Sequence, residues 1–208
     1  MRDERIVAAV MGVMLATAVS ATGAFAQGGV FGVKGGLTLA SADVEDIEGT
    51  FDTGNRTGWA AGAFFSMGSG ALSIQPELNL INLGFEATGL PGSPDVELRY
   101  FAPAVLLRLG LPLAVVRPGL LAGVGVGIEI DCQIGGATCD DADPSLETQT
   151  TDPTGLFGAD LDVAFGMGVL RAEARYLIGL RDIHEASDVW TEIKNRAWQV
   201  QAGFGFRF

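Results

Sequence analysis

The end of the chain, from Trp198 to Phe208, alternates strictly between apolar residues and small or polar ones. A period of two residues is typical of a β-strand with two unlike faces. The polar face has almost no bulk, because it consists of glycine, glutamine and a single arginine. A small polar inner face and a bulky aromatic outer face indicate a strand of a transmembrane β-barrel. A soluble lipocalin-like carrier is the alternative fold, and it would need bulky apolar residues on the inner face.

The same alternation recurs along the chain and predicts eight strands. Their ranges are 30–39, 58–67, 72–84, 96–109, 115–130, 156–167, 170–180 and 198–208. The connections alternate between long and short, which is the plan of bacterial outer-membrane barrels. We therefore expect an all-β fold, an eight-stranded antiparallel up-and-down transmembrane barrel. Its short turns and both termini would face the periplasm, and its four long loops would face outside.

One region could be mistaken for a membrane-spanning helix. Leu111 to Ile128 is strongly apolar, but Pro112 and Pro118 interrupt it and Arg117 lies inside it. Glycine also recurs there at every second position from 123 to 127. A helix has no use for glycine at that period, whereas a strand that lines a narrow lumen does.

The N-terminus resembles a secretory signal. An apolar stretch covers 6–19, and Ala24-Phe25-Ala26 fits the small-x-small pattern of a cleavage site. Acidic residues at 3 and 4 offset the two early arginines, which departs from the usual pattern. We expect a signal peptide over 1–26 and a barrel domain over 27–208. An uncleaved anchor is the alternative, but the apolar stretch is short for a span.

The two cysteines, Cys132 and Cys139, lie in a stretch with the character of a loop. Export places them in an oxidising compartment, so we expect a disulfide between them. A metal site is the alternative, but the spacing is not that of a CxxC pair and no histidine is near.

Charged residues of the predicted strands fall mostly on the glycine-rich parity. Because buried charges must be paired, and a barrel of eight strands is filled by its own side chains, we expect a salt-bridged plug without a wide channel. Catalytic carboxylates among these charged residues are the weaker alternative.

The fourth strand carries Glu97 and Arg99 on one parity and Arg108 on the other, so we expect a β-bulge near Pro103. The predicted lumen ion pairs involve Lys34, Glu77, Arg99, Arg117, Glu129, Asp160, Asp162, Arg171, Glu173 and Arg175.

The predicted loops are strongly acidic, and the whole chain has a net charge of −12, which argues against a nucleic-acid partner. The third long loop gathers Asp140, Asp141, Asp143 and Glu147, whose oxygens suit Ca²⁺, although the spacing is not that of an EF-hand.

A lipid-modifying barrel enzyme would need a nucleophile and a base near the rim. The chain has one histidine, His184, near Ser187 and Asp188. We expect no cofactor and no catalytic set.

Four motifs in order resemble the PorT-type outer-membrane β-barrel domain family. They are Phe31-Gly-Val-Lys-Gly-Gly-Leu37, Ile74-Gln-Pro-Glu-Leu78, Leu98-Arg-Tyr-Phe-Ala-Pro103 and Glu173-Ala-Arg-Tyr-Leu-Ile-Gly-Leu180. The resemblance spans residues 28–208 and implies an eight-stranded barrel in the bacterial outer membrane, in contact with its lipid. It implies no defined activity and no loop function. The terminal strand also resembles that of bacterial outer-membrane proteins, which implies that Phe206 and Phe208 form part of the signal read by the barrel-assembly machinery.

Overall fold

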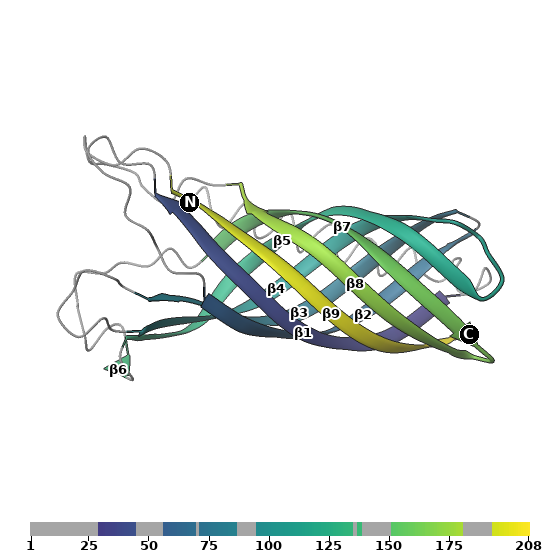
Figure 1. Ribbon diagram of the computed structural model, residues 1–208, viewed down its shortest axis with the longest axis horizontal. Coiled ribbons are helices and arrows are strands. Elements are labelled where there is room, and N and C mark those ends of the chain that lie inside the picture. The colour runs from purple at the N-terminus through teal and green to yellow at the C-terminus, as the bar shows by residue number, and fades with distance from the viewer. Residues whose placement is uncertain are drawn as a thin grey trace.

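Eight strands form one closed antiparallel barrel (Figure 1). The computed structural model describes residues 29–44, 56–69, 71–86, 95–134, 137–138, 151–180 and 193–208. Each barrel strand pairs with its neighbours in the chain, and β1 pairs with β9 to close the ring. The predicted barrel fold is therefore confirmed. The strands are β1 (Gly29–Val44), β2 (Arg56–Ser69), β3 (Leu72–Glu86), β4 (Asp95–Gly110), β5 (Val116–Ile134), β7 (Thr151–Phe165), β8 (Gly168–Gly179) and β9 (Ile193–Arg207).

The two ends of the barrel differ. Short connections join β2 to β3, β4 to β5 and β7 to β8, and they lie at the end that holds the C-terminus, which we call the turn end (Figure 1). Gly166 adopts a φ of 57° in the tight turn after β7, a conformation that favours glycine. The opposite end is the loop end, where a two-residue strand, β6 (Ala137–Thr138), pairs with the end of β5.

The alternation places bulky apolar side chains outside and polar side chains inside. Leu37, Leu78, Val124 and Val200 are more than half exposed, whereas Gln75, Glu77 and Gln199 are buried in the lumen. A soluble carrier would show the reverse, so that alternative is wrong for this chain. None of the described residues forms a helix long and apolar enough to cross a membrane.

The strands run further toward the loop end than the alternation predicted. β1 continues to Val44 rather than ending near Leu39, and β9 begins at Ile193 rather than near Trp198. A barrel strand needs only about 9–11 residues to cross a bilayer, while β1 has 16. Beyond the band of outward-facing apolar side chains that contacts the lipid, neither face of a strand has to be apolar. The period-two pattern therefore fades there while the backbone pairing continues.

The β-bulge expected near Pro103 is not there. The register of β4 against β5 is the same on both sides of Pro103, and it shifts instead between Arg99 and Tyr100, where β5 has one extra residue, Ile130. The parity of β4 is therefore unbroken, and Ala104 and Arg108 are both buried in the lumen. The expectation failed because it assumed that every charge on the strand must face inward.

The lumen has two layers. An apolar cluster fills the half toward the loop end, and it consists of Ala60, Ile81, Ala104, Leu106, Leu121, Leu156, Leu177 and Ala197. Charged and amide side chains fill the half toward the turn end, and these form the candidate site. The amino-acid pattern had suggested polar or glycine-lined walls throughout, so the apolar layer is a finding of the structure.

Candidate functional site

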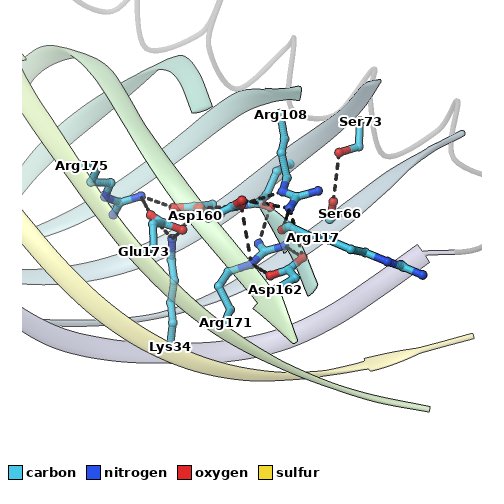
Figure 2. Close-up of polar contacts among 12 residues, drawn as sticks. Lys34, Ser66, Ser73, Arg108, Arg117, Asp160, Asp162, Arg171, Glu173 and Arg175 are labelled. Carbon is cyan, nitrogen blue, oxygen red and sulfur yellow. Dashed lines mark hydrogen bonds and ion pairs between the residues drawn. The ribbon is translucent and has the colours of Figure 1, made fainter. Parts of the chain in front are cut away.

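The first cluster of charges joins strands β1, β3 and β8. Lys34 Nζ lies 2.6 Å from Glu77 Oε1 and 3.0 Å from Glu173 Oε1. Arg175 Nη1 lies 2.7 Å from Glu77 Oε2 and 3.3 Å from Glu173 Oε1. Arg175 also donates from Nε to Gln199 Oε1 at 2.7 Å. Each of the two carboxylates thus contacts both cations, and the four charges form a closed group. Figure 2 shows Lys34, Glu173 and Arg175 of this group.

The second cluster joins β4, β7 and β8 nearer the turn end. Arg108 donates two hydrogen bonds to Asp160, at 2.6 and 2.8 Å, and Arg171 donates two to Asp162, at 2.7 and 2.8 Å. Such two-pronged bonds match the planar fork of the guanidinium group. Longer contacts of 3.4 and 3.9 Å link Arg108 with Asp162 and Arg171 with Asp160 (Figure 2). The guanidinium carbon of Arg171 also lies 4.4 Å from the centre of the Phe64 ring, a cation–π contact.

Gln75 connects the two clusters. Its Nε2 donates to Glu77 Oε1 at 2.8 Å, and its Oε1 accepts from Arg171 Nη1 at 2.5 Å. The combined network holds four cations, Lys34, Arg108, Arg171 and Arg175, against four carboxylates, Glu77, Asp160, Asp162 and Glu173. All eight residues are buried. A balanced network with charge-assisted hydrogen bonds is the arrangement that makes buried charge tolerable.

Small residues make room for this network. A Cβ atom at Gly119 of β5 would lie 2.5 Å from Asp160 Oδ1 and 3.0 Å from the guanidinium carbon of Arg108. Real Cβ atoms essentially never approach other atoms so closely, so a side chain there would displace the Arg108–Asp160 pair. Gly119, on the inner face of β5, is thus needed because the Arg108–Asp160 pair of the neighbouring strands crosses in front of it.

Seven of the ten predicted lumen residues come together in this network, and three do not. Arg99 lies on the outward parity of β4 toward the loop end and contacts Asp131 at 3.4 Å, with 42% and 31% of the two side chains exposed. Arg117 lies at the turn end and donates to the Leu113 carbonyl at an exposed position. Glu129 lies opposite Tyr100 toward the loop end. Each of the three lies toward an end of a strand that is longer than a bilayer crossing requires, where water can reach the charge.

Two important members of the network were missed by reasoning from the sequence. Arg108 was left out of the predicted lumen ion pairs, because its parity differs from that of Arg99, which was expected to face inward. Arg108 has the same parity as the small residue Ala104, and this shared parity was the signal in the sequence that could have placed Arg108 in the lumen. Gln75 was placed on the inner face, but nothing in the sequence indicates that it connects two charge clusters.

The remaining predictions fall mainly outside the described residues. Cys132 is disulfide-bonded, while Cys139 is not described, so the Cys132–Cys139 pairing stays a prediction. The acidic third-loop residues 140–147, the histidine at 184 with its neighbours and the signal segment 1–26 also lie outside the described part. Within the described ranges no group of three or more His, Cys, Asp or Glu residues could hold a metal ion.

The C-terminal aromatics lie on the outer surface at the turn end. Phe206 and Phe208 are both exposed, and Phe208 stacks on Phe65 with ring centroids 5.7 Å apart. Two backbone hydrogen bonds of 3.2 Å join Gly29 and Phe208, so the last residue takes part in closing the ring. The assembly role of these aromatics stays a prediction.

A closed ring with an apolar outer face and a charged, filled lumen defines a bacterial outer-membrane β-barrel protein. The family model of the outer membrane protein beta-barrel domain matches residues 11–208, and the chain belongs to this family. The predicted outer-membrane location is thereby confirmed.

Two solved structures share the fold. The chain is similar to Neisserial surface protein A, with 16% identity, a TM-score of 0.52 and coverage of 86% of this chain and 97% of that one. It is also similar to OprG from Pseudomonas aeruginosa, with 18% identity, a TM-score of 0.55 and coverage of 86% and 96%. At this identity the likeness concerns the fold alone. No curated protein sequence matches the chain.

Proposed function

We propose that this protein is a non-enzymatic outer-membrane barrel that acts structurally or binds at the cell surface through its acidic loops. The observation that carries the proposal is the balanced network of eight buried charges, in which each carboxylate contacts arginine or lysine. Carboxylates that are paired in this way stabilise the barrel and do not exchange protons with a substrate. The four motifs also support a finer placement within the PorT-type group.

In this proposal the loop end faces the outside of the cell. An epitope inserted at residue 143, in the third long loop, is expected to bind antibody on intact cells. The same epitope inserted after Leu113, in the short connection between β4 and β5, is the matched control. It is expected to bind only after the outer membrane has been permeabilised. The opposite pattern of labelling would overturn the proposed orientation.

A lipid-modifying enzyme is the competing function. It would depend on His184, because the chain contains no other histidine. The barrel fold itself does not decide between the two functions, because one fold carries many activities. Release of fatty acid from lipopolysaccharide by the purified protein, lost in a His184→Ala variant, would favour the enzyme over our proposal.

Binding of Ca²⁺ by the acidic third loop also stays a proposal. Hard oxygen ligands are the preferred partners of this ion. A calcium titration of the folded protein that leaves the hydrogen exchange of residues 139–150 unchanged would remove calcium from the possible partners.

Assembly by the cellular machinery is proposed to depend on Phe208. A Phe208→Ser variant is expected to lose most of its outer-membrane accumulation, measured by immunoblot of membrane fractions. Phe165→Ser is the matched control, because Phe165 is also an aromatic residue at the turn end and is 49% exposed, against 51% for Phe208.

The same two variants should be refolded in detergent as well. We expect both to refold, because a signal matters only where the machinery reads it. Failure of Phe208→Ser to refold in detergent would instead assign Phe208 a purely structural role in ring closure.

A further inference from the structure

The apolar half of the lumen contains a cavity of about 50 Å³. Its walls come from β3, β4, β5, β7 and β8, and they include Ile81, Leu83, Ala102, Leu156 and Leu177. A water molecule needs roughly 10–15 Å³ of such volume, so the space is several times that needed by one water. Walls of this composition favour an apolar occupant.

The cavity is not apolar throughout. Arg175 and Asn79 line it on the side of the charged network. Arg175 is fully buried, and its Nε and Nη1 are engaged with Gln199 and Glu77. Its Nη2 is buried and has no hydrogen-bond partner within the described structure. A buried donor that lacks a partner is costly, so a ligand that supplies an acceptor gains from filling this position.

The charge balance of the network limits which acceptor can bind there. The four cations and four carboxylates already neutralise one another. An added carboxylate or phosphate would leave an unmatched negative charge in a buried place, which is strongly unfavourable. Asp152, another wall residue, also disfavours anions. A neutral acceptor, such as a carbonyl or ether oxygen, satisfies Nη2 without disturbing the balance.

We propose that this cavity is a binding site for a small, neutral, mostly apolar molecule that carries one hydrogen-bond acceptor, with the acceptor on Arg175 Nη2 and the apolar body between Leu156 and Leu177. The described residues that line the site all lie on strands of the barrel, so the proposal extends the proposed surface role with a ligand held inside the barrel.

The test uses the protein folded in lipid nanodiscs with labelled isoleucine and leucine methyl groups. Cyclopentanone, methylcyclopentane and butyrate are added in turn, since they match in heavy-atom count but differ in polarity and charge. Cyclopentanone is expected to give saturable shifts and direct nuclear Overhauser effects at Leu156 and Leu177. Methylcyclopentane is expected to bind about tenfold more weakly, because it leaves the donor unsatisfied. Butyrate is expected not to bind.

Two variants locate the site. Ala102→Leu fills the cavity and is expected to abolish the shifts, while Ala122→Leu places the same side chain on the outer face of β5 and is expected to preserve them. Arg175→Lys retains the positive charge but loses Nη2, and it is expected to remove the preference for the ketone. If Arg175→Lys fails to fold, the comparison of the three probes on the unchanged protein still decides the point.

Four results would overturn the proposal. They are unchanged shifts in Ala102→Leu, equal binding of the hydrocarbon and the ketone, tighter binding of butyrate, and no saturable shift at all, which would indicate a cavity that holds water only.

Discussion

Replacing Arg175 with methionine is expected to lower the free energy of unfolding by about 3–5 kcal/mol, because it leaves buried carboxylates without their partner. Arg175 contacts both Glu77 and Glu173, and Lys34 alone would remain to neutralise the two. Gln199 would also lose the donor that its Oε1 accepts from. The measurement is a urea titration of the folded protein in detergent micelles, followed by the mobility of the unboiled sample on a gel.

Arg117→Met is the matched control for that loss. Arg117 is an arginine at the turn end whose Nε donates to a backbone carbonyl at an exposed position. Its replacement is expected to change the free energy of unfolding by less than about 1 kcal/mol. The double variant Arg175→Met/Glu173→Gln restores three cations against three carboxylates, and it should recover part of the loss. An equal effect of Arg175→Met and Arg117→Met would mean that the network does not hold its charges as the distances indicate.

The faces of the strands could be predicted from the sequence, since a period of two residues is a local property of the chain. In the closing strand, Val200 points outward and Gln199 inward, as the alternation predicted. The same reasoning failed on β4, where a bulge was invoked to bring Arg99 into the lumen. The strand is longer than the bilayer is thick, so its outer end could keep a charge on the outward parity without any bulge.

The contacts inside the lumen could not be predicted in the same way. Lys34 meets Glu173 across a sequence separation of 139 residues. That contact depends on how far each strand is shifted against the next when the barrel closes, which no local pattern records. The apolar layer has the same origin. Leu106 and Leu156 appear in the sequence as isolated leucines on the inner parity, and they become a cluster only when the ring brings their strands together.

A substitution on the lipid-facing outer surface is expected to cause the second large loss of stability. Leu37 lies in the middle of β1, between Trp59 of β2 and Val200 of β9, and 57% of it is exposed. Leu37→Arg is expected to lower the free energy of unfolding by about 2–4 kcal/mol, because it moves a charge to the middle of the lipid-facing surface. The measurement is the same urea titration, carried out in lipid vesicles so that a true bilayer surrounds the barrel.

The control variant Leu72→Arg distinguishes the effect of membrane depth from the effect of the leucine-to-arginine change itself. Leu72 is the first residue of β3, at the turn end, and its exposed fraction is also 57%. The same change of side chain at the same exposure is expected to cost only about 0–1 kcal/mol there, because an arginine near the membrane surface can reach water. If both leucines were exposed to water rather than to lipid, each substitution would change the free energy of unfolding by no more than about 0.5 kcal/mol. Equal effects of the two variants would therefore mean that β1 does not cross the membrane at Leu37, whereas a difference of several kcal/mol places the middle of the barrel at the centre of the bilayer.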